Sequence, residues 1–155
     1  MNRQFIDYAI DIAVKNVEFD NGGPFGAIIV KENEIISESG NQVTQLLDPT
    51  AHAEILCIRD ACRKLKSFQL TGCILYTSCE PCPMCLGAIY WARLDKVYFC
   101  AKRTDAQRFG FDDLFIYHEI KRLPEERNIP MLHSNVENAL EPFYFWQKKI
   151  NKILY

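Results

Sequence analysis

Two short motifs, far apart in the chain, constrain its fold more than any other feature. The first is His52-Ala53-Glu54 and the second is Pro81-Cys82-Pro83-Met84-Cys85. Cys82 and Cys85 are three residues apart, so on a helix both thiols lie on one face and can reach one ion. Pro83 is typical of the first turn of a helix, and the first motif stands near the start of an apolar periodic segment. A fold that uses both motifs together must bring the first turns of two helices to one point.

The side chains in these motifs predict a zinc site. One imidazole and two thiolates are ligands that zinc prefers, and three protein ligands leave the fourth tetrahedral position open to water. A helix N-terminus lowers the pKa of a thiol and so favours the thiolate form. We therefore expect His52, Cys82 and Cys85 to bind one zinc ion, while Glu54 stays free to move protons.

Cys79 leaves two other interpretations open, because Cys79, Cys82 and Cys85 form two overlapping C-x-x-C pairs. A closed structural zinc site with Cys79 as the fourth ligand is possible by ligand count, but it gives Glu54 no role. An iron–sulfur cluster of the bacterial type needs a further cysteine at position 89, which is Ile89.

The composition is that of a compact globular protein. The chain has 155 residues, of which 48% are hydrophobic and 25% charged, close to ordinary values for one domain with a sizeable core. Seven cysteines, an odd number, favour a reducing compartment. Asp7 and Asp11 interrupt any apolar segment near the N-terminus, which argues against a secretory signal. We therefore expect a cytoplasmic protein.

Neither a membrane nor a nucleic acid is an expected partner. No segment approaches the ~20 uncharged apolar residues that cross a bilayer. The formal net charge is −2, whereas a nucleic-acid-binding surface usually carries a basic excess. Lys148, Lys149 and Lys152 cluster near the C-terminus, and we interpret them as the solvated face of a helix.

Hydrophobic periodicity predicts alternating helices and strands. Strands that alternate with helices favour a layered α/β architecture with parallel strand pairs, in which we expect only the first hairpin to be antiparallel. The expected elements are a helix over 6–17, strands over 25–30 and 35–39, a loop over 40–49, a helix over 51–65, a strand over 73–77 leading into the Cys82 helix, a strand over 96–101, mixed loop and short helix over 103–130, and a weak final strand over 131–135.

Motifs spread along the whole chain add a family resemblance. They are Gly22 to Ala27, Asp48 to Glu54, Thr77 to Arg93, Gly110 to Asp113, and the terminal Asn151-Lys152-x-x-Tyr155. On these residues the chain resembles the cytidine-deaminase-like superfamily of zinc hydrolases, and within it the bacterial guanine deaminases, nearly end to end. The zinc motifs alone indicate the superfamily, whereas Phe111-Asp112-Asp113 and the terminal tyrosine indicate guanine.

The resemblance implies a fold and an assembly. The fold is a three-layer α/β/α sandwich around a mixed five-stranded sheet. Residues 1–155 form a single zinc-dependent deaminase domain with one zinc ion per subunit. The resemblance also implies a homodimer in which the C-terminal segment, 141–155, is exchanged between subunits.

The resemblance implies a reaction as well. Zinc-activated hydroxide attacks C2 of guanine. Glu54 takes the water proton, passes it to a ring nitrogen, and later protonates the leaving amine. The products are xanthine and ammonia, in purine catabolism or salvage. Backbone N–H groups of Ala53 and Cys82 help to polarise the site.

Substrate-binding residues follow from the same resemblance. Phe25 stacks on the base, Asn41 offers a donor and an acceptor to a purine edge, Asp113 accepts from guanine N–H groups, and Tyr155 closes over the bound base. Each position has a plain structural alternative. Phe25 can be core, Asn41 a turn residue after a glycine, Asp113 the N-cap of a helix from residue 114, and the tail an amphipathic helix packed on its own sheet.

Three other functions stay open. Guanosine deamination uses the same chemistry on a nucleoside. Adenosine deamination in transfer RNA shares both zinc motifs, but it requires a basic surface, which the net charge of −2 does not favour. A non-catalytic module stabilised by zinc belongs to a different class, and Glu54 and the open ligand position argue against it.

Overall fold

The computed structural model describes residues 2–154. Contacts divide the chain into two compact units, Met1–Asp113 and Leu114–Tyr155, and each is described by itself. The elements of the first unit are α1 (Arg3–Glu18), β1 (Gly26–Lys31), β2 (Glu34–Gly40), α2 (Val43–Leu46), α3 (Ala53–Leu65), β3 (Cys73–Cys79), α4 (Pro83–Trp91), β4 (Lys96–Ala101) and α5 (Arg103–Arg108).

The four strands of the first unit form one mixed sheet in the order β2-β1-β3-β4. β1 is antiparallel to both β2 and β3, and β3 is parallel to β4. The hairpin between β1 and β2 turns at Glu32 and Asn33, whose φ angles are 51° and 67°. Two successive residues with positive φ angles are typical of a tight β-hairpin, because their backbone twist matches that of the two strands. The strands predicted between residues 25 and 101 are all present.

Two predictions about the sheet are wrong. The sheet of the described residues has four strands, not five, because residues 131–135 form no strand. That segment follows Pro130 and ends in Asn135, and both proline and asparagine are depleted in strands. The first hairpin is also not the only antiparallel pair. The crossover through α3 keeps the direction of the strands but skips over β1, so β3 pairs with the oppositely directed β1.

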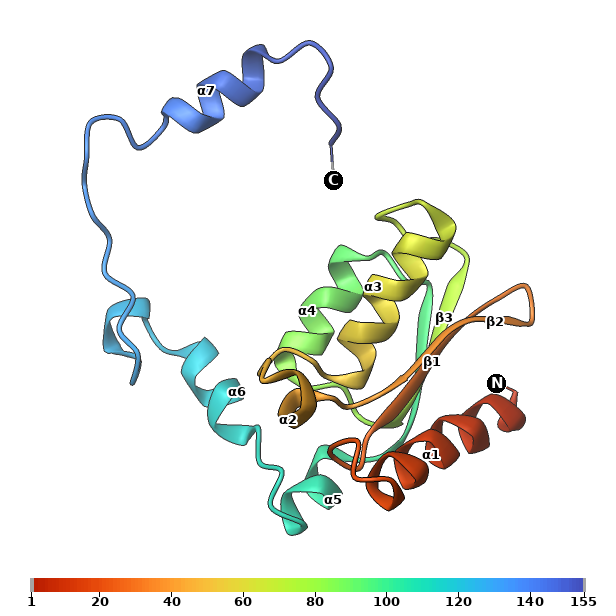
Figure 1. Ribbon diagram of the computed structural model, residues 1–155. Helices are drawn as coiled ribbons and strands as arrows, with labels where there is room; N and C mark the ends of the chain where they lie inside the picture. Colours follow the sequence, from red (N-terminus) through yellow and green to blue (C-terminus); the bar gives the residue numbers. More distant parts are fainter. Residues whose placement is uncertain (1, 155) are drawn as a thin grey trace. The chain divides into compact units, whose positions relative to one another are not determined.

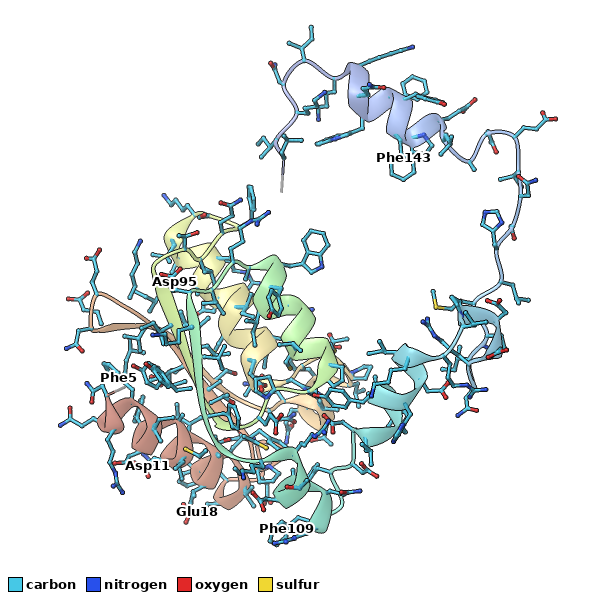
Figure 2. The ribbon with its side chains drawn as sticks, turned by 180° about the vertical axis from the view of Figure 1, so that it is seen from behind. Phe5, Asp11, Glu18, Asp95, Phe109 and Phe143 are labelled. Atoms are coloured by element: carbon cyan, nitrogen blue, oxygen red, sulfur yellow. The ribbon has the colours of Figure 1, made fainter. Side chains whose placement is uncertain are left out.

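Helices cover both faces of this sheet, so the predicted α/β/α layering holds for residues 2–113. α1 lies on one face, and α3 and α4 lie on the other (Figure 1). Under α1, Ile6, Ile28 and Val30 pack with Tyr76, whose ring lies 5.3 Å from that of Phe5, labelled in Figure 2. The larger cluster fills the space between the sheet and the other two helices; its buried members include Ala27, Ile29, Ala53, Cys57, Leu75 and Ile89.

The helix α1 is present as predicted, but its buried face includes a polar residue. The buried side chains are Ile6, Ala9, Ala13 and Asn16. By contrast, the apolar side chains Ile10, Val14 and Val17 are 37%, 50% and 48% exposed. With Pro24, Phe25, Phe109 and Phe111, among others, they line an apolar groove of about 690 Å³.

The second unit is built differently. It contains α6 (Leu114–Lys121), the 3₁₀ helix η1 (Pro124–Glu126) and α7 (Glu141–Lys148). No residue between 114 and 154 is buried, and Phe143 of α7, labelled in Figure 2, is 68% exposed. Polar contacts order part of it, since the Arg127 guanidinium donates to the carbonyl of Glu119 at 3.0 Å. None of the helices described between residues 2 and 154 is both long and apolar enough to cross a membrane.

Candidate active site

Two helices of the first unit begin at the same place. His52 is the N-cap of α3 and Cys82 is the N-cap of α4, both with extended backbone. Pro83 occupies the first turn of α4, where its missing N–H costs no helical bond. Cys85 lies in the same turn as Pro83. The convergence of two helix N-termini that the motifs predicted is therefore present.

The three expected ligands face one another. The Nδ1 atom of His52 lies 3.6 Å from the sulfur of Cys82 and 3.6 Å from that of Cys85, and the three donor atoms lie within 4.8 Å of one another. Tetrahedral zinc, with bonds of about 2.3 Å to sulfur and about 2.05 Å to nitrogen, separates these atoms by about 3.6 Å. The donor set and its spacing therefore fit zinc.

Glu54 stands beside this cluster. It is 6% exposed, accepts from the Cys85 thiol at 3.5 Å, and accepts from the Thr77 hydroxyl at 3.5 Å. Burial away from water raises the pKa of the Glu54 carboxyl. A carboxyl that holds a proton to higher pH than usual, next to a metal site, has the properties of a general acid and base.

The thiols differ in how readily they ionise. Hydrogen bonding from Cys85 lowers the pKa of Cys82 to about 4, and the same contact raises the pKa of Cys85. Burial raises the pKa of Cys79 to about 11. Cys79 is the last residue of β3, and among residues 2–154 the cluster of three metal-binding side chains does not include it. The closed structural zinc site with Cys79 as its fourth ligand, which the sequence analysis kept as an alternative, is therefore not formed.

Comparison with known proteins assigns the family. Residues 1–101 match the family described as the cytidine and deoxycytidylate deaminase zinc-binding region. The chain belongs to this family. With the cluster of His52, Cys82 and Cys85, membership makes it a zinc-dependent hydrolytic deaminase that holds one zinc ion per subunit.

Two kinds of deaminase are among the proteins most similar to this chain. The chain is 53% identical over 153 residues to guanine deaminase from Bacillus subtilis (strain 168), covering 98% of each chain. The X-ray structure of guanine deaminase from Bacillus subtilis matches with a TM-score of 0.98 at 52% identity, covering 100% of this chain and 99% of that one. A tRNA-specific adenosine deaminase from Aquifex aeolicus (strain VF5) is 49% identical over 98 residues, covering 61% of this chain and 65% of the relative.

The predicted substrate residues Phe25 and Asn41 lie next to each other in the deaminase. The backbone N–H of Asn41 donates to the Phe25 carbonyl at 2.9 Å. Phe25 packs on the larger core cluster and meets Phe111 edge-on at 4.9 Å, so it is partly core. Gln42 donates to the carbonyl of Ala51 at 2.9 Å. This bond connects the segment that carries Asn41 to Ala51, the residue that precedes His52.

The other predicted residues have different placements. Ala53 is fully buried as the first residue of α3, and the N–H of a first residue has no acceptor within its helix. Asp113 directly precedes α6. Burial raises the pKa of its carboxyl, and repulsion from Cys82 adds to the effect. Tyr155 lies outside the described residues.

Two polar residues of this region escaped the sequence analysis. Thr77 is 1% exposed and donates to Glu54, while Asn16 is 6% exposed on the core face of α1. Asn16 falls at helical spacing after Ala9 and Ala13, so a polar residue continuing an apolar stripe was the available signal. Thr77 carried no such signal, since threonine is ordinary in a strand.

Proposed function

We propose that this chain deaminates guanine, consuming one water and releasing xanthine and ammonia. The observation that carries the proposal is the end-to-end likeness to guanine deaminase from Bacillus subtilis, at 53% identity over 98% of both chains. The guanine-directed elements of the sequence, Asp113 and the C-terminal tail, lie within the stretch that this likeness covers.

The protein side chains divide the chemical work. His52, Cys82 and Cys85 are the ligands, and bound zinc supplies a Lewis acid that brings the pKa of water to about 7. Glu54 takes one proton from the attacking water and delivers it to a ring nitrogen, and it later transfers the second proton of that water to the departing amino group. Its burial and its contact with Thr77 support this role, because they hold one carboxylate oxygen in place. The N–H groups of Ala53 and Cys82, at the two helix starts, polarise the site.

Recognition of the purine is assigned to four residues. Phe25 stacks on the base, and the Asn41 amide pairs with its edge. Asp113 accepts from guanine N–H groups, and Tyr155 closes over the base. The Oδ1 atom of Asn41 also accepts from Val43 N–H at 3.2 Å, which supports a fixed orientation of this amide.

We further propose a homodimer in which residues 141–155 reach the partner's site, within one functional domain of 1–155. The C-terminal unit supports this, because its apolar side chains have no core of their own. An exposed apolar segment of this kind requires a covering surface. A cytoplasmic location is supported by the seven cysteines, all of them free thiols.

The direct test is ammonia release by purified, zinc-loaded protein from five separate substrates: guanine, guanosine, adenine, cytosine and cytidine. The Glu54→Gln variant, prepared in the same way, corrects for contaminating deaminases. Release from guanine alone or predominantly is the expected result. Ammonia release from guanosine in preference to guanine would mean that the substrate is the nucleoside rather than the base.

A second candidate is adenosine deamination in transfer RNA, favoured by the 49% identity to the relative from Aquifex aeolicus over 61% of this chain. No ammonia release from any of the five small substrates, together with formation of inosine in a transfer RNA, would establish adenosine deamination in transfer RNA. Such an activity would fall steeply with salt, because phosphate contacts release counterions. Silence on every substrate would leave a non-catalytic zinc module.

A further inference from the structure

Three segments of the first unit meet at the side chain of Asn16. Its Nδ2 atom donates two hydrogen bonds, each of 2.8 Å, to the carbonyl of Gly23 and to the carbonyl of Asn41. Asn16 belongs to α1, Gly23 to the loop before β1, and Asn41 to the segment after β2. One buried amide therefore joins a helix to the two segments that carry Phe25 and Asn41.

The junction leaves little room for movement. A Cβ added at Gly40 would lie 2.2 Å from Oδ1 of Asn16, and one added at Gly22 would lie 2.1 Å from the carbonyl oxygen of Asn41. The φ angle of Gly22 is 146°, a conformation that other residues rarely adopt. Such close backbone approach exists only because both positions are glycine, so the location of Asn41 is set within narrow limits.

Backbone hydrogen bonds connect the Asn41 segment to Phe25 and to Ala51, the residue before His52. Asn41 donates to Phe25, and Gln42 donates to Ala51, each at 2.9 Å. Ala51 is fully buried and is followed by His52. Together with the hydrogen bond from Asn16 to the Asn41 carbonyl, these bonds set the distance between Asn41 and His52.

We propose that Asn16 is a positioning residue of the deaminase, which sets the Asn41 side chain at the distance from His52 that purine binding requires. The inference rests on the proposed function, in which Asn41 contacts the purine. Asn16 does not touch the substrate in this scheme. It acts through the two carbonyls that its amide holds.

The chemistry of the side chain explains why asparagine suits this position. An amide nitrogen carries two N–H groups, one for each carbonyl. An aspartate of the same shape has no donor and places a carboxylate against two carbonyl oxygens. An alanine removes both donors without adding repulsion, at the expense of a small cavity.

The test compares Asn16→Asp with Ser37→Ala. Ser37 is a matched control because it is 1% exposed and donates one buried hydrogen bond, to the Cys57 carbonyl at 2.9 Å. For Asn16→Asp we expect the KM for guanine to rise about tenfold or more, with one zinc ion per subunit retained. For Ser37→Ala we expect a lower Tm with KM unchanged. Asn16→Ala, with the same expected direction, replaces the aspartate variant if that does not fold.

A double-mutant cycle separates positioning from general damage. If Asn16 acts through Asn41, Asn16→Asp raises KM much less in an Asn41→Ala background than in the wild type. Equal effects in both backgrounds would overturn the proposal, as would an unchanged KM in the single variant.

Amide hydrogen exchange needs no substrate, so it tests the junction even if guanine is not turned over. Asn16→Asp should speed exchange in residues 22–26 and 40–43 while α3 and α4 keep their protection. Unchanged exchange there would also refute the positioning role. If the wild type does not deaminate guanine but amide exchange is faster in the variant, the proposed substrate is refuted. The role of Asn16 in holding the two segments is then still supported.

Discussion

The two units of this chain differ in what holds them together. In residues 2–113, apolar clusters on both faces of the sheet hold the elements in place, and the helix starts that carry the zinc ligands are anchored in this core. Between residues 114 and 154 no residue is buried, and α7 exposes Phe143, Tyr144 and Phe145. The first unit therefore has an apolar core of its own, whereas the described residues of the second unit form none.

The residues assigned to the chemistry and those assigned to the substrate are distributed differently along the chain. The zinc ligands and Glu54 lie in the part that matches the deaminase family, residues 1–101. Of the four residues assigned to the purine, Phe25 and Asn41 lie within this part, and Asp113 and Tyr155 follow it in the sequence. Changes at the zinc ligands or Glu54 should therefore affect the chemistry, and changes at Asp113 or in the C-terminal tail should affect the choice and closure of the substrate.

Zinc removal should have the largest effect. We expect chelation to abolish activity while the far-UV circular dichroism spectrum is kept, because apolar clusters rather than metal ligands hold the sheet together. Added zinc should restore turnover, and added magnesium should not, since thiolates disfavour it. Unfolding on chelation would mean that the metal holds the first unit together.

Glu54→Gln should come next. We expect kcat to fall by about 10²- to 10⁴-fold, the usual contribution of a general acid and base, with zinc content unchanged by metal analysis. Gln keeps the size of the side chain and can still accept from Thr77. Loss of zinc from this variant would instead make Glu54 a ligand or a structural residue.

Asp113→Asn tests the boundary between the units. We expect kcat/KM for guanine to fall by about 10- to 100-fold, the loss of a hydrogen bond to a charged group, with Tm unchanged because the side chain is only partly buried. Asp112→Asn is the neighbouring control and should have a smaller effect. Unchanged guanine kinetics in Asp113→Asn would remove its recognition role.

Deleting Leu154 and Tyr155 tests the second unit. We expect turnover to fall by about tenfold with little change in Tm, since the apolar clusters that hold residues 2–113 together belong to the first unit. Full activity with normal guanine binding would refute closure by the tail.

A mixing experiment then decides which subunit the tail serves. Subunits with Glu54→Gln keep an intact tail, and truncated subunits keep Glu54. If tails are exchanged, mixed dimers regain one complete site and activity rises above that of either variant. No recovery in mixed dimers verified by mass would mean that each tail serves its own site.

Thr77→Val should have the smallest effect. It removes one 3.5 Å contact to Glu54 and keeps the shape of the side chain, so we expect kcat to fall by about three- to tenfold with KM unchanged. Steady-state kinetics on guanine provide the measurement. A shift in KM alone would indicate that Thr77 affects substrate binding rather than the proton carrier.

Most of the first unit could be predicted from local signals. The C-x-x-C spacing with Pro83 placed the start of a helix at Cys82, and the periodicity of residues 6–17 and 51–65 placed α1 and α3. These predictions succeeded because helix periodicity and capping act over a few residues. The final strand over 131–135 failed because a short, weakly apolar segment is a strand only if a neighbouring strand accepts it.

The sequence by itself determined the chemistry of this protein, since one imidazole, two thiolates and a spare carboxylate at these spacings suit few reactions. Only the tertiary structure decided which cysteines meet His52, that Glu54 is buried against Thr77, and that Asn16 holds the Asn41 segment. Those outcomes depend on contacts between residues far apart in the chain, such as Asn16 and Asn41. The conformational cost of such contacts is met by the packing of the whole core rather than by any local pattern.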